Sequence, residues 1–322
     1  MARAILCTLL FVVLGACASP VIHPSGHESA MPSLSNDHFI AHDGISIPLR
    51  SWIPAGQEPA AIIIAVHGFN DYSHFFAEPG AFLASRNITT FAFDQRGFGA
   101  TPAPGIWPGV PSLIKDLETL TALLRARHPG IPLYLFGESM GGAVVMVTIK
   151  QARDTGTPLG IDGAILSAPA VWGRETMPWY QNAALWLSAH TMPKAKLTGQ
   201  GLKIMASDNI EMLRALGRDP LVIKKTRVDA IYGLTNLMDA ALEAARSLDL
   251  PSLILYGEKD EIIPRAPTEL MLSRMPEASV ASRKVILYAN GYHMLTRDLQ
   301  RQTVWRDIAG WIDTHPGVAR AK

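Results

Sequence analysis

The amino-acid sequence predicts an α/β protein built on a mostly parallel sheet with helices on both faces. Short apolar runs recur along the chain, and amphipathic helical patterns separate them. Continuous apolar runs are typical of strands that are buried on both faces, and strands that alternate with helices form parallel sheets. Hydrophobic residues make up 48% of the chain and charged residues 18%, a balance that supplies a large buried core.

Charge and cysteine content exclude several classes of function. The chain has 29 basic and 28 acidic residues, so it has no cationic excess to neutralise the phosphates of a nucleic acid. Its 2 cysteines make neither a disulfide framework nor a four-cysteine zinc site. No apolar run reaches the ~20 residues of a membrane-spanning helix. We therefore expect neither nucleic-acid binding nor a polytopic membrane protein.

The N-terminus has the pattern of an export signal. Arg3 precedes an apolar stretch over 4–13 that is too short to span a membrane. Leu14-Gly15-Ala16-Cys17 follows and resembles the bacterial lipobox, which implies cleavage before Cys17 and lipidation of its thiol and new amino group. An ordinary signal peptide with an incidental cysteine is the alternative. Because Ala18 rather than Asp follows, the sorting pattern predicts an exported lipoprotein anchored in the bacterial outer membrane and facing the periplasm.

The chain divides into a leader, a spacer, and a core with an insertion. Residues 1–16 are the expected signal peptide. Residues 17–37 hold several prolines and serines without apolar periodicity, which predicts a flexible tether. The core is expected over 38–171 and 245–322. Between these parts, 172–244 breaks the strand–helix alternation and is rich in Trp, Met and Leu, which predicts a helical lid. The alternative for its aromatic side chains is simple packing onto the core.

The core begins with a hairpin over 39–52, whose turn lies at Asp43-Gly44. Helical patterns cover 113–127 and 141–153. Buried strands are expected over 62–66, 90–93, 133–136, 164–166, 253–256 and 284–287. Ligand sites in open α/β sheets form at the carboxyl ends of the strands. Chemistry is therefore expected directly after each apolar run.

A candidate nucleophile follows the third of these strands. Gly137-Glu138-Ser139-Met140-Gly141 matches the pattern G-x-S-x-G and lies between an apolar strand and a helix, as the pattern requires. Glycines on both sides of Ser139 permit a sharp, strained turn that lifts the hydroxyl above the sheet. The alternative is a glycine-rich turn without catalytic function.

A serine hydroxyl needs a base that removes its proton, and the expected chain order is serine, then acid, then histidine. Asp260 follows the strand at 253–256 and is the predicted acid, with Glu258 and Glu261 as alternatives. His293 follows the last strand and is the predicted base. His315 lies in the polar tail.

Acyl transfer also needs hydrogen-bond donors for the oxyanion that develops on the substrate. The backbone N–H of Met140, directly after the nucleophile, is one expected donor, and that of Phe69, after the strand at 62–66, is the other. His67 lies in the same loop as Phe69. Because His67 precedes the serine in the chain, we expect it to brace this loop and not to act as the base.

These motifs resemble the α/β-hydrolases of the monoacylglycerol lipase and lysophospholipase group, of the serine aminopeptidase S33-like or hydrolase-4 type. The resemblance covers about 37–313 and includes the insertion. It rests on His67-Gly68-Phe69, Asp94-Gln95-Arg96-Gly97-Phe98-Gly99, Gly137-Glu138-Ser139-Met140-Gly141-Gly142, Leu166-Ser167-Ala168-Pro169, Gly257-Glu258-Lys259-Asp260 and Gly291-Tyr292-His293. The stretch that begins at Arg96 departs from the family's usual Arg-Gly-His-Gly-x-Ser, and we expect it to be structural.

The resemblance and the residues together imply an α/β-hydrolase fold and a serine hydrolase that cleaves carboxylic esters of lipids without metal or organic cofactor. An apolar lid favours a substrate with one acyl chain, such as a monoacylglycerol or a lysophospholipid. A thioesterase, a peptidase or an acyltransferase would use the same triad, so these activities stay open. A non-catalytic lipid-binding lipoprotein is the alternative of another class. Ser139 argues against haloalkane dehalogenases and epoxide hydrolases, which have aspartate at this position.

Overall fold

The computed structural model describes residues 18–26, 30–56, 58–199, 201 and 203–315. The described strands are β1 (Ser33–Leu34), β2 (His38–Ile40), β3 (Ser46–Trp52), β4 (Ala61–Val66), β5 (Ile88–Phe93), β6 (Leu133–Glu138), β7 (Gly163–Ser167), β8 (Lys196–Leu197), β9 (Thr226–Arg227), β10 (Ser252–Gly257) and β11 (Arg283–Tyr288). The helices are η1 (Ser73–Phe76), α2 (Ala77–Ala84), α3 (Val110–Arg127), α4 (Met140–Thr155), α5 (Trp179–Thr191), α6 (Ile210–Arg218), α7 (Val228–Ala244), η2 (Ala245–Ser247), α8 (Arg265–Arg274), η3 (Glu277–Ser282) and α9 (Arg301–Thr314).

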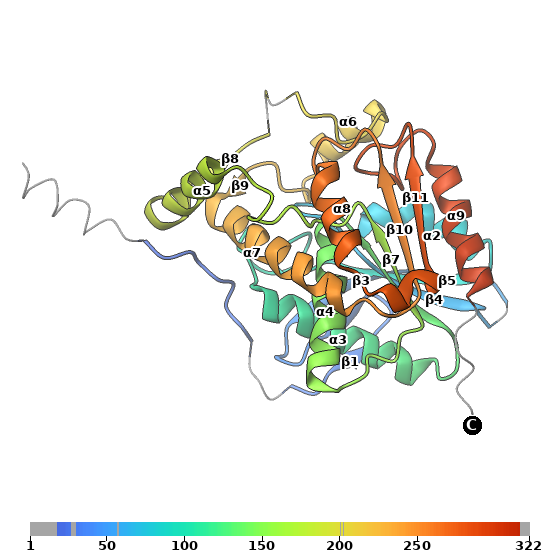
Figure 1. Cartoon of the computed structure of the whole chain (residues 1–322). Coiled ribbons are helices and arrows are strands. Elements are labelled where there is room, and N and C mark those ends of the chain that lie inside the picture. The colour runs from blue at the N-terminus through green and yellow to red at the C-terminus, as the bar shows by residue number, and fades with distance from the viewer. Residues whose placement is uncertain (1–17, 27–29, 57, 200, 202, 316–322) are drawn as a thin grey trace, which may run out of the picture.

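One large sheet organises the molecule, in the order β1-β2-β3-β5-β4-β6-β7-β10-β11. Within this sheet, β5, β4, β6, β7, β10 and β11 are parallel, whereas β1, β2 and β3 pair in antiparallel fashion at one edge. Figure 1 shows helices on both sides of this sheet. The predicted fold class, an α/β-hydrolase fold with a mostly parallel and doubly covered sheet, is confirmed.

Alternating side chains of the central strands build two separate cores. On β4, Ile62, Ile64 and Val66 face the core that α3, α4, α7 and α8 cover. Ala61, Ile63 and Ala65 face the other core, which η1, α2 and α9 cover. Both faces of the strand are buried, which explains why its sequence is apolar without alternation.

The predicted elements of the core appear where the sequence places them. Each of the six predicted strands lies within an observed strand, and both predicted helices lie within α3 and α4. The burial expected for 284–287 is wrong, because β11 is an edge strand with only one neighbour and its side chains are partly exposed. The predicted hairpin is formed by β2 and β3, and Gly44 in its turn has a φ of 83°. That positive φ is the conformation that favours glycine over other residues.

The segment before the hairpin differs from the flexible tether predicted for 17–37. Residues 18–26, which we call the N-terminal strap, lie along the domain. The N–H of Ala18 donates to the carbonyl of His190 at 2.8 Å, and that of Val21 donates to Asp229 Oδ2 at 3.1 Å. His23 is buried, and both its ring nitrogens contact backbone carbonyls at 2.8 Å. Hydrogen bonds from backbone N–H groups hold this segment against the domain. Such bonds do not require apolar side chains at regular spacing, so the sequence pattern did not indicate them.

The insertion over 172–244 contains two kinds of helix. α7 packs on α4 and contributes Leu237, Met238 and Ala241 to the first core. α5 and α6 lie at the periphery, and Trp179 and Trp186 on α5 are 80% and 56% exposed. Its aromatic side chains therefore only partly pack the insertion onto the core.

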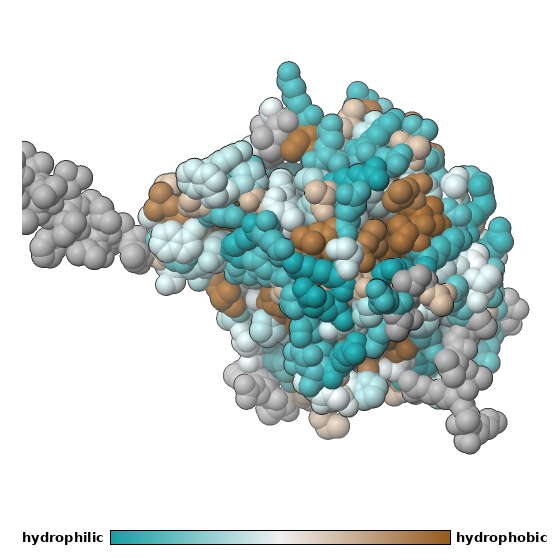
Figure 2. Space-filling model, viewed as in Figure 1, coloured by the Kyte–Doolittle hydropathy of each residue, from teal (hydrophilic) through white to brown (hydrophobic). Residues whose placement is uncertain are grey.

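The edge strand β11 also exposes apolar side chains. Val285 and Leu287 lie outward, and Figure 2 shows hydrophobic residues gathered where Figure 1 places β10 and β11. Among the residues that the structure describes, no helix is long and apolar enough to cross a membrane. The predicted signal peptide and Cys17 lie outside the described residues.

Candidate active site

Ser139 occupies a strained turn between β6 and α4. Its φ of 54° and ψ of −117° lie outside the regions that residues with a side chain ordinarily adopt. A Cβ on Gly137 would collide with the backbone of Gly141, and a Cβ on Gly141 would collide with the carbonyl of Val66. The two glycines therefore allow this turn to pack directly against β4. The serine is half-buried, with its hydroxyl at the carboxyl edge of the sheet.

The structure brings the three predicted residues of the triad together. His293 Nε2 lies 2.8 Å from Ser139 Oγ, and His293 Nδ1 lies 2.8 Å from Asp260 Oδ2. The tautomer that satisfies both contacts donates from Nδ1 to the carboxylate and accepts the serine proton at Nε2. The side chains of His293 and Asp260 are almost completely buried.

Asp260 is held by the backbone around it. Its Oδ1 accepts from the N–H of Ile262 at 2.8 Å and from that of Ile263 at 3.0 Å. These bonds leave Oδ2 for the imidazole of His293. The loop thus fixes the carboxylate before any substrate binds.

Two neighbouring parallel strands explain why Asp260 and His293 meet. β10 precedes the loop of Asp260, and β11, its partner in the sheet, precedes that of His293. A Cβ on Gly257 would collide with the backbone of Gly291, so the two loops touch directly. The N–H of Lys259 donates to the carbonyl of Gly291 at 2.9 Å.

The alternative acids and the alternative histidine lie elsewhere. Glu258 is exposed, and the carboxylate of Glu261 accepts from the N–H of Met205 at 2.7 Å. His315 follows α9 and stacks on Trp311 at 4.6 Å between ring centroids. None of the three takes part in the contacts around Ser139.

The two predicted oxyanion donors lie beside Ser139. Met140 is the first residue of α4, so its N–H has no partner within the helix and lies at the positive end of the helix dipole. Phe69 follows Gly68, where a Cβ would lie only 3.4 Å from the Cβ of Ser139. The ring of Phe69 packs on Phe98 at 5.6 Å between centroids, which fixes the loop.

His67 braces this loop, as the sequence led us to expect. Its Nδ1 donates to the carbonyl of Gly68 at 2.7 Å, and its Nε2 accepts from the N–H of Gln95 at 2.9 Å. Complete burial lowers the pKa of His67, which favours the neutral ring that these two bonds require. Both nitrogens are occupied, so this histidine is not available as a base.

The Arg96 loop is structural. The buried guanidinium of Arg96 forms two hydrogen bonds with Asp43, at 2.5 and 2.7 Å, and two with Asp116, at 2.6 and 2.7 Å. These bonds tie the loop after β5 to the β2–β3 turn and to α3.

Sequence analysis missed a buried cluster next to the triad. Arg297, four residues after His293, pairs with Asp71 and with Glu138 at 2.7 Å each. Thr296 donates to the second oxygen of Glu138 at 2.8 Å. The only signal in the sequence is the position of Glu138 and Arg297 close to the predicted nucleophile and base.

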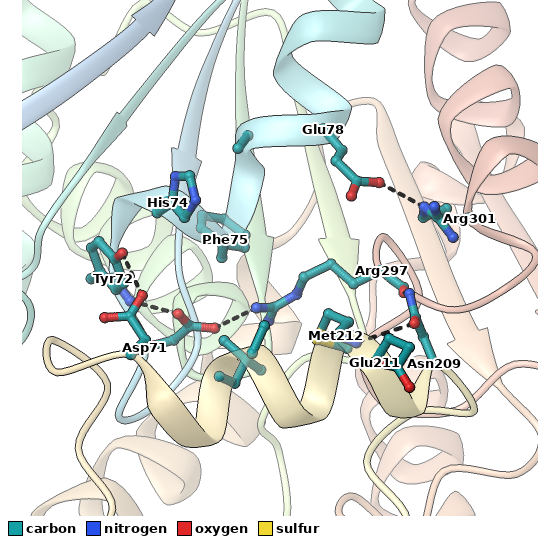
Figure 3. Close-up of a pocket in the computed structure, with 14 residues that line it drawn as sticks. Asp71, Tyr72, His74, Phe75, Glu78, Asn209, Glu211, Met212, Arg297 and Arg301 are labelled. Carbon is teal, nitrogen blue, oxygen red and sulfur yellow. Dashed lines mark hydrogen bonds and ion pairs between the residues drawn. The ribbon is translucent and has the colours of Figure 1, made fainter.

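A pocket of about 500 Å³ lies beside this cluster. α6 forms one wall, with Met212, and η1 and α2 form the opposite wall, with Phe75 and Glu78 (Figure 3). Arg297 and Arg301 complete the lining, whereas Ser139, Asp260 and His293 are not part of it. Over the described part of the chain, no group of three or more His, Cys, Asp or Glu side chains is arranged to hold a metal ion.

Comparison with curated proteins finds similar enzymes in bacteria and eukaryotes. The chain is 24% identical over 293 residues to the monoacylglycerol lipase of Mycolicibacterium smegmatis, covering 87% of this chain and 98% of that protein. It is 26% identical over 323 residues to the monoglyceride lipase of Saccharomyces cerevisiae, covering 91% and 97%.

Comparison with solved structures finds the same fold. A soluble variant of the Saccharomyces cerevisiae monoglyceride lipase in complex with a substrate analog superposes with a TM-score of 0.71 at 23% identity, covering 92% of this chain and 99% of that one. The monoacylglycerol lipase of Paleococcus ferrophilus superposes with a TM-score of 0.69 at 22% identity, covering 84% and 99%.

The family model Hydrolase_4, described as serine aminopeptidase, S33, matches residues 57–300. This match spans most of the sheet, the insertion, and Ser139, Asp260 and His293. The chain therefore belongs to the serine aminopeptidase S33 family of α/β-hydrolases, and monoacylglycerol lipases are among its relatives.

Proposed function

We propose that this protein is a serine hydrolase that cleaves carboxylic esters of lipids, with a monoacylglycerol or a lysophospholipid as substrate. The observation that carries the proposal is the unbroken path of contacts from Ser139 Oγ through the imidazole of His293 to Asp260, with 2.8 Å at each step. The lipase relatives, which align over most of their length, support esters as the bond that is cleaved.

The geometry supports the following reaction. Ser139 Oγ attacks the ester carbonyl while His293 Nε2 takes the serine proton. Asp260 holds the imidazole in the required tautomer and stabilises its cation. The N–H groups of Phe69 and Met140 stabilise the oxyanion. His293 then donates its proton to the leaving alcohol, and a water molecule that His293 activates releases the fatty acid from Ser139.

The apolar insertion favours an acyl chain over a peptide as the group that is recognised. The thioesterase, peptidase and acyltransferase activities use the same triad and are the alternatives to be tested. A non-catalytic lipid-binding protein does not need a serine in a strained turn with an imidazole at hydrogen-bond distance.

The cellular location is part of the proposal. We infer that Cys17 is lipidated and that the protein faces the periplasm on the outer membrane. Ala18, the residue that follows, is hydrogen-bonded to the carbonyl of His190 on α5, so an anchor at Cys17 would leave the domain beside that helix. The exposed Trp179 and Trp186 of α5 suit a surface next to lipid.

The decisive experiment is labelling with a fluorophosphonate probe, followed by assays on two substrate series. We expect wild type to be labelled and Ser139→Ala to be unlabelled. Hydrolysis is expected for monoacylglycerols and p-nitrophenyl esters of rising chain length, and not for aminoacyl anilides. Folded wild type that resists the probe would favour the binding protein, and preference for anilides would favour a peptidase.

A further inference from the structure

The active site is built on four loops that leave four different strands, and the loop after β10 carries Asp260. The loop after β4 carries Phe69, the turn after β6 carries Ser139, and the loop after β11 carries His293. The sheet fixes where each loop starts, but strand pairing ends before the reacting groups. Beyond the strand ends, contacts between the loops therefore set their relative positions, and backbone packing at Gly68, Gly141 and Gly257 supplies some of them.

Arg297 makes the side-chain contacts that link three of these loops. It belongs to the loop of His293, and its Nη1 lies 2.7 Å from Oδ2 of Asp71, two residues after Phe69. Its Nη2 lies 2.7 Å from Oε1 of Glu138, the residue before Ser139. One planar guanidinium thus joins the loops of Phe69, Ser139 and His293, and Figure 3 shows its side chain reaching across the pocket to Asp71.

Each carboxylate partner of Arg297 is fixed in turn. The N–H of Asp71 closes a turn onto the carbonyl of Gly68, and Oδ1 of Asp71 accepts from the N–H of Tyr72 at 2.9 Å. The second oxygen of Glu138 accepts from Thr296 at 2.8 Å. The guanidinium therefore contacts groups that cannot shift without moving the loops themselves.

The cluster is buried, which makes its contacts strong and specific. Arg297, Asp71 and Glu138 are each less than 9% exposed. Burial alone would lower the pKa of Arg297, but the two carboxylates outweigh it and raise that pKa, so the guanidinium stays charged. Lysine offers a single compact charge and cannot reproduce a fork that bonds two carboxylates at once.

We propose that Arg297 is a positioning residue that holds the oxyanion loop, the nucleophile turn and the histidine loop in their reactive arrangement. This inference rests on the proposed function. A displacement of about 1 Å between reacting groups costs up to roughly 100-fold in rate, which sets the size of the effect to expect. The effect falls on the rate of acylation, because the loops that Arg297 joins carry the nucleophile, its base and an oxyanion donor. Arg297 itself contacts no group of the triad and is not a reacting group.

The test compares Arg297→Met and Arg297→Lys with wild type and with the control Arg306→Met. Arg301 is not used as the control, because its Nη1 lies 3.3 Å from the carbonyl of Asp298 in the histidine loop. Arg306 lies on α9, is exposed, and its guanidinium lies 3.4 Å from Gln302 of the same helix. Melting temperature and circular dichroism establish that each variant is folded. The readouts are the rate constant for fluorophosphonate labelling of Ser139, and kcat and KM for a p-nitrophenyl ester.

We expect Arg297→Met to lower the labelling rate and kcat by about 10- to 100-fold with KM changed less than about threefold. Arg297→Lys should recover only part of the loss, and Arg306→Met should stay within about twofold of wild type. Glu138→Gln combined with Arg297→Met should be no slower than Arg297→Met alone, because both substitutions break the same contact.

Wild-type rates in folded Arg297→Met would overturn the inference, and so would additive losses in the double variant. If Arg297→Met does not fold, Arg297→Lys decides by the same criterion, since wild-type rates in that variant would show that the fork is not required. Wild type that does not react with the probe at all would overturn the proposed function and this inference with it. A reactive wild type with an equally reactive Arg297 variant would overturn this inference alone.

Discussion

The carboxylate of Asp298 accepts a hydrogen bond from the backbone N–H of Tyr292, the residue before His293, at 2.8 Å. Its other oxygen accepts from the hydroxyl of Ser207, in the insertion, at 2.6 Å. Asp298 and Ser207 are fully buried. The loop that presents His293 is therefore tied to the insertion through one buried carboxylate.

This carboxylate predicts a stability that depends on pH. Burial raises the pKa of Asp298 from its ordinary value of 3.8 to about 6. The folded state thus binds the proton more tightly than the unfolded state does, and the stability gained in this way is complete below about pH 4 and lost as pH rises through about 6. As the pH rises from about 4 to about 6, we expect the melting temperature of wild type to decrease relative to that of Asp298→Asn.

Thermal unfolding followed by circular dichroism from pH 4 to pH 8 checks this prediction. Asp313→Asn is the matched control, because it removes an exposed carboxylate and changes the net charge equally. A difference between wild type and Asp298→Asn that stays constant over the whole range would contradict the assignment.

Replacing Asp260 by Asn should impair catalysis without unfolding the protein. The amide would no longer hold the tautomer of His293 that accepts the serine proton, and loss of this function in a triad lowers kcat by about 10⁴-fold. Steady-state kinetics on a p-nitrophenyl ester measures the effect. Glu258→Gln, which changes an exposed carboxylate of the same loop, should leave kcat unchanged. If Glu258→Gln caused the larger loss, the acid would be wrongly assigned.

Arg96 should matter for stability more than any exposed arginine. Arg96→Met leaves the buried carboxylates of Asp43 and Asp116 without the opposite charge that pairs with them, which costs about 3–5 kcal/mol in the free energy of unfolding. Urea unfolding measures it. Arg246→Met is the control, since the pair of Arg246 with Glu243 is exposed and a pair of this kind contributes at most about 1 kcal/mol. Equal losses in the two variants would show that the Arg96 cluster does not stabilise the loop.

The proposed lipidation of Cys17 predicts that replacing this cysteine moves the protein away from the outer membrane. Wild type expressed in a bacterium should incorporate labelled palmitate and sediment with the outer membrane, whereas Cys17→Ser should do neither. Cys7→Ser, within the expected signal peptide, should behave like wild type. If palmitate were still incorporated into Cys17→Ser, Cys17 would not be the lipidated residue, and the prediction from the lipobox would be wrong.

The sequence predicted the sheet and the triad for reasons that are local. Strands buried on both faces, such as β4, are uniformly apolar, so short continuous apolar runs between helical patterns reveal them. Asp260 and His293 each come shortly after a strand end, and parallel strands place those ends at one edge.

Other features depend on contacts that no local pattern announces. Arg297 finds its partners 159 and 226 residues away in the chain, and nothing near it in sequence identifies them. The N-terminal strap lacks any apolar period because backbone donors hold it. The lipobox at Cys17 stays a prediction.

The order of the strands also has a consequence for biosynthesis. β11 lies at the outer edge of the sheet and is the last of the described strands, and the imidazole that contacts Ser139 follows it. Ser139 is therefore synthesised long before His293, and about half of the chain is translated while the serine has no base to accept its proton. The hydroxyl gains chemical reactivity only when the final strand docks, so a truncated or half-finished chain is inert toward esters.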